Sequence, residues 1–127
     1  MMKPFEREKY DFETPDREGF EYLLNPEMIF YQDMLLMKSP GLNPKEINKT
    51  VKDLGVAGTQ RFFNHVHLML YAYDYNLQRQ WADELEQAWR KRIESQYPEW
   101  VSIIERKDDG YDIEVTFRIA RRQKGVA

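Results

Sequence analysis

The chain has 127 residues, of which 42% are hydrophobic and 32% are charged, and it contains no cysteine. This length suits one domain with one hydrophobic core, and the lack of cysteine excludes disulfides, thiolate nucleophiles and cysteine-ligated metal sites. The formal net charge of −3 does not supply the positive field that steers most proteins to nucleic acid, so a nucleic-acid partner is not expected.

The apolar residues are distributed as in a soluble protein. No apolar run approaches the roughly 20 residues of a membrane span, and the first ten residues lack the apolar centre of a secretory signal. We therefore expect a cytoplasmic protein that does not enter a membrane.

Charge is distributed unevenly between the two ends of the chain. Acidic residues outnumber basic ones over residues 1–35, whereas the last part of the chain has basic side chains and no acid after Glu114. We treat residues 1–127 as a single domain with a loosely ordered arm over 1–13 and a basic tail over 120–127. The candidate contacts for an anion or an acidic partner are Arg118, Arg121, Arg122 and Lys124.

The first half of the chain predicts helices and contains one ambiguous segment. Pro15–Leu24 predicts a short helix, because proline is favoured at the first helical position and an acidic residue follows it. Met28–Met37 is apolar on every side; its methionine and leucine content favours a helix, but a buried strand fits nearly as well. Asn43 and Glu46 form the clearest capping box, and Gly55 is expected to end the helix that follows.

The second half predicts a strand, a long helix and a hairpin. The alternation over Arg61–Tyr73 predicts one long strand. Leu77–Tyr97, with Asn76 as its cap, carries its apolar residues on one arc of a helical wheel and predicts an amphipathic helix. Trp100–Arg106 and Tyr111–Ile119 alternate on either side of an Asp-Gly turn and predict a β-hairpin.

Together these elements predict an α+β fold. We expect an antiparallel or mixed sheet of about three to four strands, with one long amphipathic helix across one face. Additional shorter helices come from the N-terminal half.

Two histidines, His65 and His67, are the sharpest local signal for chemistry. Strand alternation puts both imidazoles on one face, roughly 6.5–7 Å apart, and this spacing lets them share a divalent metal ion. The run from Asn64 to Leu70 is similar to the HUH motif of single-strand endonucleases and small tyrosine transposases.

That resemblance implies a metal-dependent attack on a phosphodiester by a tyrosine on a helix. The long predicted helix offers Tyr97 in this role, at its last turn. Asp112 and Glu114 of the hairpin are the obvious donors of a third metal ligand, provided that they share the face of the histidines.

The outer face of the predicted Arg61–Tyr73 strand also has the composition of a protein interface, because aromatic residues and methionine are enriched in interface cores. Its interface candidates are Phe63, Met69, Tyr71 and Tyr73. Our first hypothesis is a small cytosolic interaction or assembly module, without catalytic activity or cofactor, that meets itself or another protein through this face. The second is a divalent-metal-dependent phosphodiester enzyme that uses His65 and His67.

Overall fold

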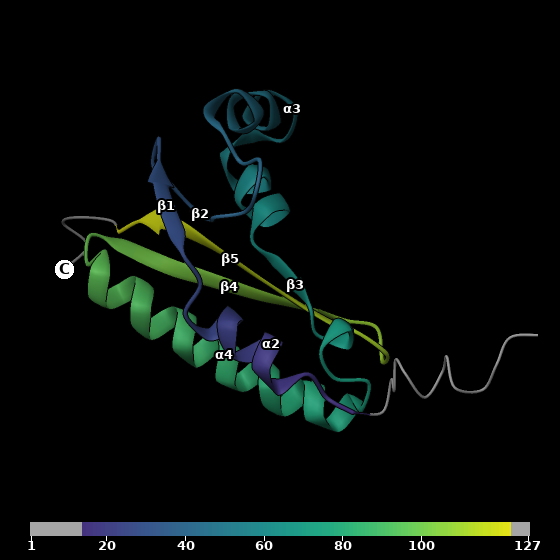
Figure 1. Ribbon diagram of the computed structural model, residues 1–127. Helices are drawn as coiled ribbons and strands as arrows, with labels where there is room; N and C mark the ends of the chain where they lie inside the picture. The colour runs from purple at the N-terminus through teal and green to yellow at the C-terminus, as the bar shows by residue number, and fades with distance from the viewer. Residues whose placement is uncertain (1–13, 123–127) are drawn as a thin grey trace, which may run out of the picture.

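The computed structural model describes residues 14–122 and confirms a mixed α+β fold with antiparallel sheets. The larger sheet has the strand order β3-β5-β4, in which β4 (Trp100–Asp108) and β5 (Ile113–Arg121) form a hairpin and β3 (His65–His67) pairs with the other edge of β5. Helix α4 (Tyr75–Gln96) runs across one face of this sheet (Figure 1).

The main core lies between α4 and the sheet. The amphipathic pattern of α4 buries one side of the helix, and the alternation of β5 buries every second residue of that strand. Trp89 of α4 meets Phe117 of β5 edge to face, with 4.7 Å between ring centres. The short helix α2 (Arg17–Leu24) lies beside α4, where Phe20 stacks on Trp81 at 4.5 Å.

The helix starts differ slightly from those expected. Asp16 caps α2 by accepting from the backbone N–H of Gly19, so the helix begins after the predicted Pro15. Asp74 caps α4 through Leu77, two residues before the expected cap Asn76. Each site offers two capping side chains two residues apart, Thr14 and Asp16 before α2 and Asp74 and Asn76 before α4.

The ambiguous segment over residues 28–37 is neither one helix nor one strand. It forms a second hairpin of β1 (Met28–Tyr31) and β2 (Met34–Met37). Its two turn residues, Gln32 and Asp33, have φ angles of 49° and 65°, as tight hairpin turns with left-handed residues require. The helix that we favoured for this segment was therefore wrong. The segment is apolar on both sides for a reason other than helix formation.

That reason is a second core on the other face of the β1–β2 hairpin. Leu35 packs into the main core, whereas Met34 and Leu36 point the opposite way and pack against Ile47 of helix α3 (Pro44–Phe63). Successive strand residues therefore enter two different cores, and the sequence shows no polar face.

Helix α3 begins at the predicted Asn43 cap, and its first helical segment ends at Gly55 as expected, but a second helical segment follows directly. Gly55 has φ 76° and ψ 177°, which interrupts the helix with a kink, and the helix resumes as far as Phe63. Glycine adopts this conformation without the penalty that a side chain would bring.

The long strand predicted over Arg61–Tyr73 was also wrong. Only His65–His67 are strand; the residues before them belong to α3, and Leu68–Leu70 form the short 3₁₀ helix η1. Period-two alternation of apolar residues misled the prediction, since this stretch combines a helix end, a strand and a tight turn that each bury some of them.

Two buried amides, Gln60 and Asn64, explain why β3 is short. Beyond the pair of His65 and Thr116, these side chains meet the β5 edge in place of a strand: Gln60 Oε1 accepts from the N–H of Ile119, and Asn64 Nδ2 donates to the carbonyl of Phe117. On their other side the same amides bind β2, with Asn64 Nδ2 donating to the carbonyl of Leu35 at 2.7 Å. This amide bridge joins the two sheets edge to edge.

Within residues 14–122, the helices and the β1–β2 hairpin leave part of the larger sheet uncovered. The side chains of α3 pack on the β1–β2 hairpin, while no helix within residues 14–122 covers the far face of the larger sheet near the β4–β5 turn (Figure 1). No helix within residues 14–122 has both the length and the apolar character needed to cross a bilayer.

Candidate functional site

The uncovered part of the sheet, which we call the open face, carries both histidines. His65 lies opposite Thr116 and His67 lies opposite Glu114 in the β3–β5 register. Side chains directly opposite on antiparallel strands point to the same side, so the shared face expected for the histidines and Glu114 is present.

His67 is tied to β5 by two carboxylates. Its Nδ1 lies 2.6 Å from Asp112 Oδ2, and its Nε2 lies 3.4 Å from Glu114 Oε2. The other oxygen of Asp112 accepts from the backbone N–H of Met69 at 3.1 Å. Asp112 therefore holds β3 and the start of η1 against the hairpin turn, which is a structural role.

His65 is anchored to the end of α3. Its Nδ1 lies 2.7 Å from the carbonyl oxygen of Phe62, and since a carbonyl only accepts, Nδ1 carries the hydrogen in this contact. Its ring centre lies 5.2 Å from that of His67, with the ring planes at 81°. The two rings meet edge to face.

The geometry does not complete a metal centre. Among the residues that the structure describes, no three or more histidine and carboxylate groups are placed to hold a metal ion. Metal binding by His65 and His67 remains a prediction from the sequence, and it lacks an assembled third ligand.

Tyr97 lies too far along the sheet to serve these histidines as a nucleophile. It caps the C-terminus of α4 beside the Trp100 end of β4, where it stacks on Phe30. Trp100 pairs with Arg121, five positions along β5 from the Thr116 opposite His65, or about 17 Å at the usual strand rise. The arrangement that the HUH resemblance implies is therefore not brought together around Tyr97.

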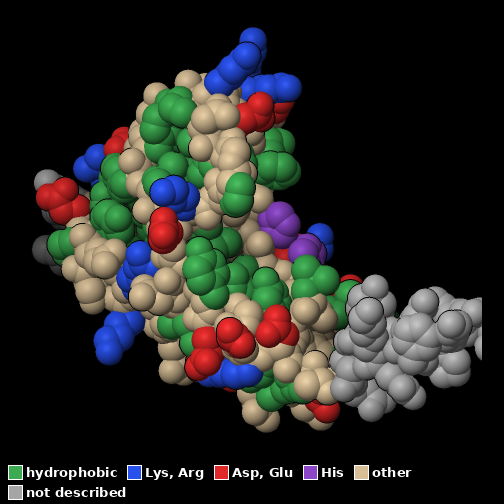
Figure 2. Space-filling model, in the orientation of Figure 1, with side chains coloured by type: hydrophobic (Ala, Val, Ile, Leu, Met, Phe, Trp, Pro, Cys, Tyr) green, Lys and Arg blue, Asp and Glu red, His purple; other side chains and the backbone are tan. Residues whose placement is uncertain are grey.

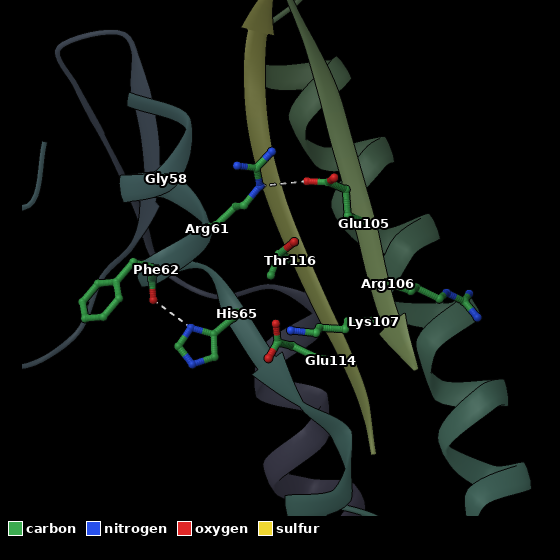
Figure 3. Close-up of a pocket in the computed structure, with 9 residues that line it drawn as sticks. All are labelled: Gly58, Arg61, Phe62, His65, Glu105, Arg106, Lys107, Glu114 and Thr116. Atoms are coloured by element: carbon green, nitrogen blue, oxygen red, sulfur yellow. Dashed lines mark hydrogen bonds and ion pairs between the residues drawn. The ribbon is translucent and has the colours of Figure 1, made fainter. Parts of the chain in front are cut away.

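A groove of about 610 Å³ lies on the open face between the end of α3 and the strands (Figure 3). Charges of both signs line it. Glu105 accepts from Arg61 Nε at 3.1 Å and lies 3.8 Å from Arg118 Nε, and Lys107 points toward Glu114. Because opposite charges are matched across the groove, it presents no strong field of either sign to a ligand.

The predicted interface residues separate into two groups. Phe63 packs against the second core and Tyr71 against the main core, so neither is a free surface residue. Met69 and Tyr73 are 44% and 64% exposed. The four side chains do not share one strand face, because only His65–His67 of this stretch form a strand.

Two exposed neighbours were missed from the sequence. Leu70 is 72% exposed and Tyr111 is 78% exposed. Tyr111 follows the Asp-Gly turn directly, and a turn position is the signal that would have found it. We call these two residues together with Met69 and Tyr73 the tyrosine rim.

Three residues of the tyrosine rim, Met69, Tyr73 and Tyr111, border a small hollow at the end of the sheet where η1 meets the β4–β5 turn. The hollow has a volume of about 250 Å³ and is lined by Met69, Tyr73, Tyr75, Gly110 and Tyr111. Hydrophobic side chains lie on both sides of the two histidines in Figure 2. Large exposed apolar side chains gathered around a hollow favour an interaction site.

The basic residues near the C-terminus do not form one cluster. Arg118 lies beside Glu105 on the open face, Arg121 packs over the ring of Trp100 at 4.6 Å, and Arg122 Nε donates to the carbonyl of Pro98. Lys124 lies outside the described residues. The three described arginines therefore make separate local contacts and do not point to a common anion site.

No family model, no curated protein and no solved structure matches the chain.

Proposed function

We propose that this protein is an interaction module that binds a second copy of itself through the tyrosine rim. The observation that carries the proposal is the exposure of Leu70, Tyr73 and Tyr111, which are 72%, 64% and 78% accessible at one end of the sheet. Tyrosine and methionine are enriched at the centres of interfaces, where one aromatic anchor often dominates the binding energy.

The backbone under the rim is held by a dense set of hydrogen bonds. Asp112 accepts from Met69, Asp109 accepts from the N–H of Tyr111 at 2.9 Å, and the N–H of Asp16 donates to the carbonyl of Tyr71 at 2.7 Å. A rim that is ordered before binding loses little conformational entropy when a partner arrives. The ordered backbone therefore presents these exposed apolar side chains at fixed positions, which favours binding.

A second copy is the partner that the proposal names, because two-fold self-association is the commonest assembly of soluble proteins. The proposal includes a cytoplasmic location and assigns no catalytic step to the protein. A cysteine-free chain suits a reducing compartment, and the described histidine pair has no assembled third ligand.

Sedimentation velocity over a range of protein concentrations tests the proposal. We expect the wild type to form a dimer and the Leu70→Ser/Tyr111→Ser variant to sediment as a monomer. Tyr22→Ser is the matched control, since Tyr22 is 60% exposed but lies on α2 away from the hollow. A wild type that stays monomeric at every concentration, or a dimer that the rim variant leaves intact, would overturn the proposal.

A further inference from the structure

The hollow inside the tyrosine rim is built from aromatic rings. Tyr73, Tyr75 and Tyr111 line it together with Met69 and the backbone of Gly110. Tyr73 and Tyr75 also line a second hollow of about 560 Å³ with Asp74 and Asn76. Aromatic faces carry partial negative charge, and several rings around one hollow attract a cation.

Two carboxylates, those of Asp108 and Asp109, accept hydrogen bonds from residues that line this hollow. The Tyr75 hydroxyl donates to Asp108, and this bond, with a second from the N–H of Gly110, lowers the pKa of Asp108. Backbone N–H groups of Asp112 and Tyr111 lower the pKa of Asp109 in the same way. These carboxylates are therefore ionised at neutral pH.

The charged side chains around the hollow carry a net negative charge. Asp74 caps α4 and also lines the second hollow. Asp112 accepts from the backbone N–H of Met69 through Oδ1 and contacts His67 through Oδ2. Arg79 adds one opposing charge, which acts on Tyr75 and Asp108 from α4. An anionic ligand would be repelled here, whereas a cation is attracted by the ionised carboxylates.

We propose that the hollow binds an alkylammonium group, supplied by a lysine side chain, bare or methylated, of a bound protein chain. The cation contacts the tyrosine faces while the carboxylates of Asp108 and Asp109 balance its charge, and its methylene stem lies along Met69. The inference rests on the proposed function, since it names the chemical group that a partner brings to the tyrosine rim.

The first test compares two small probes of the same shape. Choline carries a quaternary ammonium, and 3,3-dimethylbutan-1-ol replaces that nitrogen with neutral carbon. Titrated into the full chain and followed by the amide signals of Gly110 and Tyr111 in NMR spectra, choline is expected to bind at least about tenfold more tightly than the alcohol. Equal binding of both probes, or saturation by neither, overturns the proposal.

Variants locate the site and test the role of the ring. Tyr111→Leu is expected to weaken choline binding by about tenfold, whereas Tyr111→Phe keeps the aromatic face and binds within about twofold of wild type. Tyr22→Leu removes an exposed tyrosine of α2, which is 60% accessible, and leaves binding unchanged. Loss of affinity in Tyr22→Leu, or none in Tyr111→Leu, contradicts the assignment.

A third arm identifies the source of the ammonium. Peptides with an acetylated N-terminus that contain one lysine, with zero or three methyl groups on Nζ, are titrated beside a peptide of equal length that contains norleucine instead. Binding of the lysine peptides and not of the norleucine peptide supports the proposal, and binding of choline alone overturns the lysine source. These titrations use dilute protein, so their outcome is read separately from self-association in the sedimentation experiment.

Discussion

Asn64 shows how one buried side chain can satisfy several strands. It is fully buried, donates to the carbonyls of Leu35 and Phe117, and accepts from the N–H of Met37 at 2.8 Å. Each of these backbone groups would otherwise lie without a partner away from water. The Asn64 side chain therefore makes the backbone hydrogen bonds that a neighbouring strand would otherwise make.

Replacing Asn64 with alanine is expected to lower the free energy of unfolding by about 2–4 kcal/mol, because it leaves buried backbone groups unpaired. Urea denaturation followed by circular dichroism measures the change. Asn48→Ala is the control, since Asn48 is an exposed asparagine of α3 that accepts only the Tyr31 hydroxyl. A loss below about 1 kcal/mol for Asn64→Ala would show that water replaces the bridge.

The two histidines are expected to differ in their contribution to stability. His67→Ala removes the contacts to Asp112 and Glu114 and should cost about 1 kcal/mol. His65→Ala should cost less than about 0.5 kcal/mol, because His65 is exposed and its hydrogen bond goes to the Phe62 carbonyl. Urea midpoints of both variants, with EDTA and with Zn²⁺ or Mn²⁺, measure this. A metal-dependent rise in the wild type that both variants lose would instead establish the metal site predicted from the sequence.

At the scale of elements, the kink of α3 depends on Gly55. With φ at 76° and ψ at 177°, Gly55 occupies a region that residues with a side chain rarely adopt, although no atom lies within 4 Å of an added Cβ. Gly55→Ala is therefore expected to lower the free energy of unfolding by about 1–3 kcal/mol through backbone strain alone. Lys52→Ala, at an exposed helical position nearby, should change it by less than about 0.5 kcal/mol. If Gly55→Ala is as stable as wild type in thermal unfolding, the kink straightens without cost.

The stability of the contact between α2 and α4 should depend on pH, because Arg17 and Glu84 form an ion pair between the two helices. Both guanidinium Nη groups donate to the Glu84 carboxylate, at 2.8 and 2.5 Å, and this lowers the pKa of Glu84 below its ordinary value of 4.5. A carboxyl group whose pKa is lowered on folding stabilises the fold at pH values above its ordinary pKa. This contribution is lost as the pH falls through the pKa of the folded state. The relevant window therefore lies below about pH 5.

Glu84→Gln is accordingly expected to be less stable than wild type at pH 7, with the difference shrinking toward pH 3. Urea midpoints at several pH values measure this, and Glu94→Gln on the exposed side of α4 serves as the control. Because both partners are about two-fifths exposed, solvent screens the pair and the effect will be small. A difference that stays constant over the whole range would exclude the ion pair as its cause.

Elements with a long single period were predictable, and elements set by distant contacts were not. Helix α4 and the β4–β5 hairpin carry periods of 3.6 and 2 over many residues, so their patterns identify them. Residues 28–37 serve two cores, and the residues around β3 change conformation every few positions. Local periodicity does not record which segment supplies the other half of a core.

At the scale of the whole molecule, the α+β class followed from the sequence, but the candidate surface followed only in part. Met69 and Tyr73 were found because they are large apolar residues in an alternating stretch, and they are exposed. Phe63 and Tyr71 were assigned to the same face by a strand that does not form. Tyr111 joins the rim from the β4–β5 turn, and only the folded chain shows that this turn meets η1.

The amide bridge also determines how the molecule should open locally. Amide hydrogens of Leu35 and Ile119 are both held by Gln60 Oε1, and that of Met37 is held by Asn64 Oδ1. Rotation of two side chains releases all three at once, although they belong to segments far apart in the chain. Hydrogen exchange should therefore report them as one cooperative unit that opens before the β4–β5 ladder, so that the β1–β2 hairpin detaches while the α4-covered sheet stays folded.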